Sequence, residues 1–228
     1  SDILYATGRK FNDYQDLPYN KQSVFDHYIP RICEMYRTLK PTGTLWLQMD
    51  MRISHWIRNI CDDIFGYKNF INEIVWYYSN GGGRSKTHCN KQHDNIIVYS
   101  KTNNFKYNML RVPYKETSGY SKSGIVNNGK LYLPNKDGKN IDNVWEIPII
   151  NPMSHERLKY STQKPEKLLE NIILCSTDNN DIVADFYCGS GTTLAVAKRL
   201  GRKIIGCDIN ENAIKITNNR LISLNDYF

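Results

Sequence analysis

The stretch DIVADFYCGSGTTLAVAKRLGRKIIGCDIN, residues 181–210, carries the clearest structural signal in the chain. The apolar run DIVADFY predicts a buried strand, and GSGTT then turns the backbone into a helix, TTLAVAKRL, that ends at Gly201. The second apolar run, RKIIGCD, predicts a strand parallel to the first, because a crossover helix joins the two. This unit therefore predicts a ligand crevice beyond the carboxyl ends of both strands.

The glycine corner indicates a nucleoside cofactor. Gly189 and Gly191 would let the main chain approach a ligand where a Cβ would collide. Asp208 follows Gly189 by 19 positions, which places a carboxylate where it can accept the hydroxyls of a ribose. A tight turn without a ligand is the alternative. Leu194 stands where a dinucleotide fold has its third glycine, which disfavours a nicotinamide-dependent oxidoreductase, and no Lys follows the glycines as in a P-loop.

The rest of the chain alternates between the two periodicities of helices and strands. This alternation predicts one α/β domain over residues 1–228, with a mostly parallel central sheet and helices on both faces. Residues 102–160 lack long periodic runs and predict an irregular, partly hairpin-like excursion. The expected helices are 23–39, 52–65, 163–177 and 211–224, and the further expected strands are 44–50, 71–78 and 94–101. Ser23 is the expected N-cap of the first helix and Asn210 that of the last.

Positive charge is concentrated in one segment. The formal net charge is +7 and the pI is about 9.0. Residues 84–139 contain eleven Lys and Arg residues against three acids, which exceeds the whole surplus. The same segment is rich in Tyr, Asn, Ser and Gly, a composition suited to a polyanion that also offers flat bases. A solvated, lysine-rich loop region is the alternative.

The composition argues against membranes, metals and disulfides. No run of 18 apolar residues and no basic-then-apolar leader is found, so neither a membrane span nor a signal peptide is expected. The six cysteines form no C-x-x-C pair, and several lie within apolar runs, where Cys behaves as a small hydrophobe. We expect a cytoplasmic protein without a metal site.

The corner DFYCGSGTT resembles the F-x-G-x-G motif of S-adenosylmethionine-dependent DNA amino-methyltransferases, whose usual form is D-P-F-x-G-S-G-T-T. Thr162, Gln163, Lys164 and Pro165 resemble the T-Q-K-P segment of the same family, which helps to bind the methionine half of the cofactor. The resemblance implies the circularly permuted β group, with a Rossmann-like methyltransferase fold and the cofactor motif after the catalytic one. It implies S-adenosylmethionine as cofactor, bound by Asp185, Phe186, Tyr187, Cys188, Gly189, Ser190, Gly191, Thr192, Asp208, Gln163 and Lys164.

The opening SDILYATG resembles the family's catalytic D-P-P-Y motif. The resemblance implies that Asp2 and the backbone carbonyl of Ile3 accept the amine hydrogens of the target base, and that Tyr5 stacks on the base. Ile3 and Leu4 replace the two prolines, so impaired catalysis is an alternative. Asp16, in DLPYN, is the alternative position for the motif, but almost no loop would then separate it from the following helix.

The resemblance implies a DNA methyltransferase of a restriction-modification system that flips its target base. Aspartate in the catalytic motif favours adenine, with cytosine as the alternative. Double-stranded DNA is the expected partner, and a homodimer and a cognate restriction endonuclease are further candidates. The expected DNA contacts are Arg84, Lys86, Lys91 and His93, and an inserted target-recognition region is expected at about residues 80–140.

Overall fold

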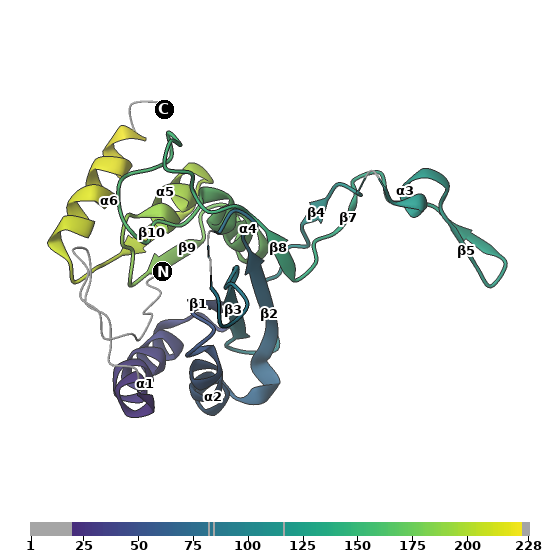
Figure 1. Cartoon of the computed structure of the whole chain (residues 1–228). Helices are drawn as coiled ribbons and strands as arrows, with labels where there is room; N and C mark the ends of the chain where they lie inside the picture. The colour runs from purple at the N-terminus through teal and green to yellow at the C-terminus, as the bar shows by residue number, and fades with distance from the viewer. Residues whose placement is uncertain (1–19, 82, 84, 116, 225–228) are drawn as a thin grey trace.

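The computed structural model describes residues 20–224 apart from residues 82, 84 and 116. Its described part is an α/β body from which one long arm extends (Figure 1). The body contains two groups of strands with helices around them, and the arm leaves it between β3 and β8.

The larger sheet has the strand order β1-β3-β2-β8. These strands are Thr44–Met49, His93–Ser100, Phe70–Tyr77 and Val144–Glu146 respectively. β3 runs antiparallel to both β1 and β2, whereas β2 and β8 are parallel. The expected parallel arrangement is therefore interrupted at β3, because a loop without a crossover helix joins it to β2.

Helices cover both faces of this sheet, as predicted. Successive side chains of a strand point to opposite faces. In β3, Ile97 and Tyr99 pack into the core formed with α1 and α2, whereas Ile96 and Val98 pack into the core shared with α4. The strand is therefore buried on both sides, which explains its continuous apolar sequence.

The first core is built by α1 (Lys21–Thr38) and α2 (Ser54–Phe65), and a 3₁₀ turn over Tyr67–Asn69 leads from α2 to β2. The prediction that Ser23 caps α1 is wrong. The helix begins two residues earlier, and the side chain of Asn20 caps it by accepting the Ser23 N–H at 2.8 Å. Asn and Ser are equally good caps, so the sequence alone did not discriminate between them.

The second group of strands contains the predicted strand–corner–helix–strand unit. β9 (Ile182–Asp185) and β10 (Lys203–Gly206) are parallel, with Asp185 opposite Gly206. They are joined by α5 (Thr192–Arg199), flanked by α4 (Glu166–Ser176) and followed by α6 (Glu211–Ser223). Both strands end at the same edge, as a ligand crevice at their carboxyl ends requires.

A cavity of about 410 Å³ separates the two groups of strands. All the residues of β1 and of β9 line it, together with side chains of α1 and α4. At the carboxyl ends of the strands its lining includes Gln48, Asp185, Phe186 and Tyr187. The cavity therefore extends to the predicted cofactor corner.

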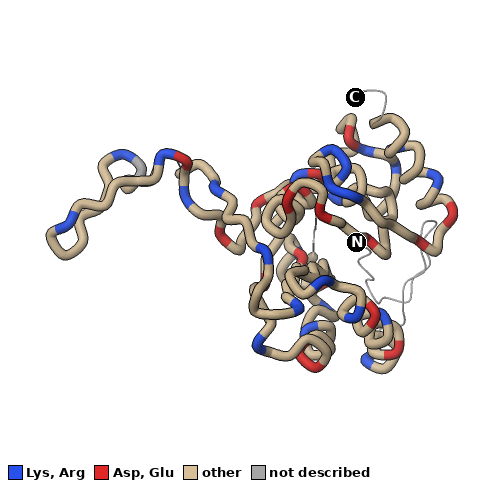
Figure 2. Tube along the Cα trace, turned by 180° about the vertical axis from the view of Figure 1, so that it is seen from behind, with Lys and Arg blue, Asp and Glu red and all other residues tan. Residues whose placement is uncertain are grey.

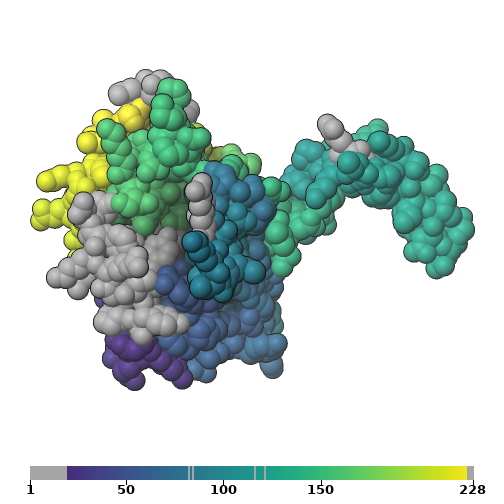
Figure 3. Space-filling model, in the orientation of Figure 1, coloured from purple at the N-terminus to yellow at the C-terminus, as the bar shows by residue number. Residues whose placement is uncertain are grey.

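The arm, residues 110–141, stands clear of the body (Figures 1 and 3). A backbone hydrogen bond of 2.9 Å from the Ile141 N–H to the Leu110 carbonyl closes its base. It contains two short antiparallel ribbons and one short helix, which confirms the expected hairpin-like excursion. These elements are β4 (Arg111–Val112) with β7 (Lys139–Asn140), α3 (Gly119–Ser123), and β5 (Ile125–Asn127) with β6 (Lys130–Tyr132).

Candidate cofactor site

The glycine corner lies between β9 and α5 and has a backbone that only glycine adopts easily. Gly189 and Gly191 have φ angles of +51° and +72°, in the left-handed region. A Cβ on Gly191 would lie 2.7 Å from Thr217 Oγ1, and a Cβ on Gly189 would lie 3.2 Å from a ring carbon of Tyr160. Both positions therefore require glycine, because the φ angles would strain any other residue and the neighbouring side chains leave little room for a Cβ.

The carboxylate of Asp208, two residues after the end of β10, is hydrogen-bonded to this corner. Its Oδ2 accepts the backbone N–H of Gly189 at 2.9 Å, and its Oδ1 accepts the N–H of Asn210 at 2.8 Å. An ionised carboxylate has about four acceptor positions, so further positions remain for ribose hydroxyls. The carboxylate thus connects the segment that follows β10 to the corner that follows β9.

The other corner residues take distinct positions. The Asp185 carboxylate accepts the Tyr187 N–H at 3.1 Å, and Phe186 is partly exposed on the cavity rim. Cys188, Ser190 and Thr192 are buried. A small polar cavity at the corner is lined by Tyr187, Cys188, Gly189, Ser190, Thr192 and Thr193 and, from the preceding segment, Tyr160, Thr162 and Lys164.

The T-Q-K-P segment folds against the corner. The Lys164 ammonium is buried and donates to the Thr162 carbonyl at 2.7 Å. Gln163 serves the loop itself, because its side chain donates to the Glu156 carbonyl at 2.6 Å and accepts the Leu158 N–H at 2.7 Å. Lys164 therefore faces the small cavity, and Gln163 holds the loop that carries it.

A side chain of α1 also reaches the corner. The hydroxyl of Tyr187 lies 3.3 Å from His27 Nε2, and the two rings are 6.3 Å apart. Burial and the positive charge of Arg31 lower the pKa of His27 to about 4, so its imidazole is neutral at pH 7. The neutral ring connects the helix that follows the N-terminal residues to the cofactor corner.

A second polar cluster lies at the carboxyl end of β1. The Lys91 ammonium lies 2.6 Å from Asp50 Oδ2 and 2.7 Å from Asp94 Oδ1, and both carboxylates are buried. Arg52 donates to both oxygens of Asp50, to Oδ1 at 2.9 Å and to Oδ2 at 3.2 Å. Burial favours a raised pKa for Asp50, but hydrogen bonds from Arg52 and Lys91 outweigh it and hold the pKa below its ordinary value.

The model of the N6/N4 DNA methylase family matches residues 1–219. A type II methyltransferase, M.HpaI of Haemophilus parainfluenzae, is 36% identical over 227 residues, which cover 98% of this chain and 67% of that protein. The DNA adenine methyltransferase YhdJ of Escherichia coli K12 is 31% identical over 222 residues, covering 97% and 74% of the two chains.

The chain belongs to the N6/N4 DNA methylase family. This family is dependent on S-adenosylmethionine, which agrees with the predicted cofactor. Another relative, M1.MboII of Moraxella bovis, is 37% identical over 162 residues. The match covers 65% of this chain and 61% of that protein.

Solved structures of methylases share the fold. The complex of M1.HpyAVI with S-adenosylmethionine superposes with a TM-score of 0.63 at 22% identity, covering 88% of this chain and 84% of that one. The cytosine-N4-specific PvuII methyltransferase gives a TM-score of 0.65 at 17% identity, covering 93% and 76%. The Rossmann-like methyltransferase fold that the sequence predicted is therefore confirmed.

The methylase structure places part of the predicted site. It brings together the corner, Asp208 and Lys164, whereas Asp2, Ile3, Tyr5 and Arg84 lie outside the described residues. Lys86 is exposed in the loop before β3, and His93 begins β3 opposite Tyr77. Lys91, predicted to contact DNA, has its ammonium between two buried carboxylates.

Sequence reasoning did not identify Asp50, His27, Thr217 or Arg220. Asp50 carried a usable signal, because like Asp208 it directly follows an apolar strand. The partners of the other three residues are distant in the sequence, and nothing local marks them. Within the described residues, no cluster of His, Cys, Asp and Glu could hold a metal ion, and none of the helices is long and apolar enough to span a membrane.

We expect His27 to make the methylase less stable as the pH falls from about 6.5 to about 4. The unfolded chain binds a proton on this histidine in that range and the folded chain does not, so unfolding is favoured at the lower pH. Because His27 is only half-buried, we expect an effect of about 1–2 kcal/mol in the free energy of unfolding. Urea unfolding across this range should show a shallower pH dependence in His27→Gln. The exposed His55→Gln is the control, and an unchanged slope in His27→Gln would contradict the prediction.

We expect Lys91→Met to lower the free energy of unfolding by about 3 kcal/mol. The variant removes the ion pair of the buried Asp94 carboxylate and one of the two cations that bind Asp50, and breaking a buried ion pair leaves charge uncompensated. Lys86→Met changes an exposed lysine of the same loop and should cost less than about 0.5 kcal/mol. Equal urea midpoints for the two variants would show that the Lys91 cluster does not stabilise the fold.

Proposed function

We propose that this protein transfers a methyl group from S-adenosylmethionine to the exocyclic amino group of adenine in a specific sequence of double-stranded DNA. The observation that supports this most is that the glycine corner contacts both the Asp208 carboxylate, by a hydrogen bond, and the Lys164 segment, with which it lines a small cavity. The relative M.HpaI is named a type II methyltransferase and YhdJ a DNA adenine methyltransferase.

The residues of the crevice fit the cofactor by their chemistry. A Cβ at Gly189 would approach Tyr160, so this glycine keeps the wall of the small cavity open. Asp208 is the acceptor for ribose hydroxyls, and the polar lining from Lys164 to Thr193 suits the amino-acid half. When bound, the cofactor supplies a methyl group already activated by the sulfonium. The work left to the protein is to bind and orient the reactants.

The target amine is the part of the reaction that needs an acceptor. Its lone pair is delocalised into the base, so the nitrogen is a poor nucleophile. In this proposal the carboxylate of Asp2 and the carbonyl of Ile3 accept the two amine hydrogens and direct the lone pair at the methyl group. Tyr5 stacks on the flipped base, which offsets the cost of a few kcal/mol of removing it from the duplex.

The arm is the proposed target-recognition element of one catalytic domain. It contains six Lys and Arg residues against two acids, and Figure 2 shows them spaced along its length. Ile125, Val126, Leu131 and Tyr132 are exposed near its tip, available to contact bases. Cations position such an element on phosphates, and groove contacts select the sequence.

Replacing Lys122, Lys130 and Lys136 together by Gln should therefore weaken DNA binding and reduce its dependence on salt. Each lost phosphate contact lowers the slope of log K against log salt by about 0.9, so a loss of up to about 2.7 is expected. Fluorescence anisotropy over a salt series measures this slope. The same slope in the triple variant and the wild type would exclude the arm from the phosphate contacts.

The partners and compartment follow from the same proposal. A type II system pairs a methyltransferase with a restriction endonuclease of the same specificity, and we include a homodimer among the expected assemblies. Host DNA is the substrate, so the cytoplasm is the compartment. In this proposal the arm forms the DNA-facing surface together with Arg84, Lys86 and His93. Lys91 anchors the loop between β2 and β3 through its ion pairs with Asp50 and Asp94.

A methyl-transfer assay tests the proposed function. The protein is incubated with methyl-labelled S-adenosylmethionine and DNA from a methylation-deficient host, and the nucleosides are identified by mass. N6-methyladenine is expected. Detection of N4-methylcytosine instead would show that the target base is cytosine. Binding of cofactor and DNA without methyl transfer would identify a catalytically impaired homologue, an alternative suggested by Ile3 and Leu4 in place of the two prolines.

A further inference from the structure

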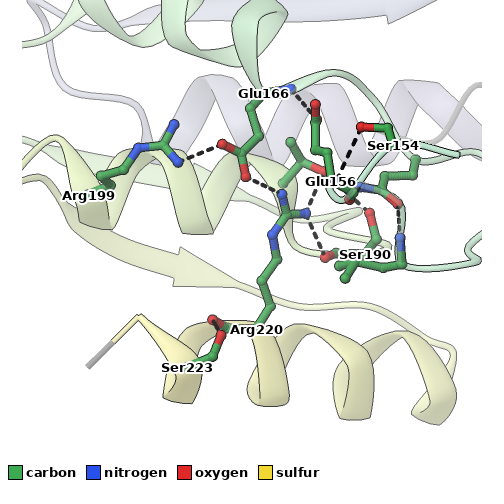
Figure 4. A network of polar contacts seen from close by, with 10 residues as sticks. Ser154, Glu156, Glu166, Ser190, Arg199, Arg220 and Ser223 are labelled. Atoms are coloured by element: carbon green, nitrogen blue, oxygen red, sulfur yellow. Dashed lines mark hydrogen bonds and ion pairs between the residues drawn. The ribbon is translucent and has the colours of Figure 1, made fainter. Parts of the chain in front are cut away.

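The helix α6 contacts the cofactor corner through two side chains. Thr217 and Arg220 are three residues apart and therefore lie on one face of α6. Thr217 Oγ1 donates to the Gly189 carbonyl at 3.0 Å. Arg220 Nη1 donates to the Ser190 carbonyl at 3.3 Å and to Thr192 Oγ1 at 2.9 Å (Figure 4). Two successive carbonyls of the corner are thus bound by α6.

The second nitrogen of the same guanidinium reaches the other half of the site. Arg220 Nη2 donates to Glu166 Oε1 at 2.6 Å. Glu166 begins α4 directly after the T-Q-K-P segment, and its own N–H donates to Glu156 Oε1 at 2.7 Å. The Arg220 side chain is only 9% exposed. One buried guanidinium therefore spans the glycine corner and the segment that carries Lys164 (Figure 4).

Glu166 is suited to this bridging position because it stays ionised. Burial favours a raised pKa, but the hydrogen bonds from Arg199 and Arg220 outweigh it and hold the pKa of Glu166 below its ordinary value. Arg199 Nη1 binds Oε2 at 2.5 Å, so the two arginines occupy different oxygens. Of the two described arginines that bind Glu166, only Arg220 also binds the glycine corner.

We propose that Arg220 is a positioning residue for the cofactor, which sets the glycine corner against the Lys164 segment. It acts through the backbone. Arg220 donates to the Ser190 carbonyl. In a trans peptide the carbonyl and the N–H point in opposite directions, so this bond directs the Gly191 N–H away from α6, where it donates to the Cys188 carbonyl at 2.7 Å and closes the turn of the corner. Arg presents donors in a planar fork that can bind two acceptors at fixed angles, whereas the Lys ammonium is a single point charge. Losing Arg220 would free both halves of the site to move apart.

The test compares cofactor affinity in variants of the two arginines. We expect Arg220→Met to raise the Kd for S-adenosylmethionine by tenfold or more in calorimetry. In the methyl-transfer assay its KM for the cofactor should rise similarly, with kcat at saturating cofactor within about threefold of wild type. Arg220→Lys should restore part of the affinity. Arg199→Met is the matched control, because it removes a cation from the same carboxylate without touching the corner, and its Kd should stay within twofold.

A Kd in Arg220→Met that equals that of Arg199→Met would overturn the inference. So would a loss confined to kcat. If Arg220→Met does not fold, Glu166→Gln replaces it, because this variant keeps the side-chain size and weakens the same bridge. A Kd within twofold of wild type for both Glu166→Gln and Arg220→Lys would also overturn the inference. The inference rests on the proposed use of the cofactor at this corner. Wild-type protein that binds no S-adenosylmethionine would end the proposed function, whereas equal binding by wild type and Arg220→Met would end only the role of Arg220.

Discussion

Gly191→Ala is expected to weaken the binding of S-adenosylmethionine about a hundredfold. Gly191 has a φ of +72°, and an L-residue in that conformation costs about 1–2 kcal/mol. The new Cβ would also lie 2.7 Å from Thr217 Oγ1 and 3.0 Å from Thr217 Cβ, an overpacking that costs about 1–3 kcal/mol. Thr217 would have to move, and its hydrogen bond to the Gly189 carbonyl would break. About 3 kcal/mol lost from the bound geometry corresponds to roughly a hundredfold in Kd.

Gly66→Ala is the matched control for this variant. Gly66 also has a positive φ, +84°, but a Cβ there would meet nothing within 4 Å. It follows α2, outside the cofactor corner, so it reports backbone strain without the steric conflict. Calorimetry with S-adenosylmethionine should give wild-type affinity for Gly66→Ala. Wild-type affinity in Gly191→Ala as well would mean that the corner does not seat the cofactor.

Asp2→Ala is expected to reduce methyl transfer by about 10²–10⁴-fold, the range in which a positioned proton acceptor acts. The carboxylate in this proposal accepts hydrogens from the target amine and has no contact with the cofactor. The Kd for S-adenosylmethionine should therefore stay within twofold of wild type while the transfer rate falls. Single-turnover transfer to unmethylated DNA, measured beside calorimetry with the cofactor, separates these two quantities.

Asp16→Ala decides between the two candidate positions of the catalytic motif. Asp16 lies in DLPYN, which matches the motif more closely letter by letter. If Asp2 is the acceptor, Asp16→Ala should retain transfer within a few fold of wild type. Full activity in Asp2→Ala together with loss of activity in Asp16→Ala would move the catalytic position to Asp16.

The cofactor corner could be predicted from the sequence because its signals are local. Two glycines, a following helix and an acid at a fixed spacing lie within about thirty residues, and each has one structural meaning. The Asn210 cap of α6 was predicted for the same reason and is present, since its Oδ1 accepts the N–H groups of Asn212 and Ala213. The strand–corner–helix–strand unit and the start of α6 were therefore predicted correctly.

Features that depend on distant pairing could not be predicted in this way. The place of β3 between β1 and β2 depends on pairing with two other strands, and its apolar sequence does not specify these neighbours. Lys91 belongs to a basic loop, so its sequence context suggested phosphate contact. Its partner Asp50, 41 positions away in the sequence, becomes visible only when the strands are assembled. Arg220 lies in a helix whose sequence gives no hint of Glu166, 54 positions earlier.

The most direct test of the central claim, that the crevice at Gly189, Gly191 and Asp208 holds the cofactor, is a crystal structure of the protein with S-adenosylhomocysteine, the demethylated product. The expected result is a ribose hydrogen-bonded to the Asp208 carboxylate and an amino-acid moiety in the cavity lined by Lys164 and Thr192. A product molecule bound elsewhere on the chain, with this crevice filled only by solvent, would contradict it.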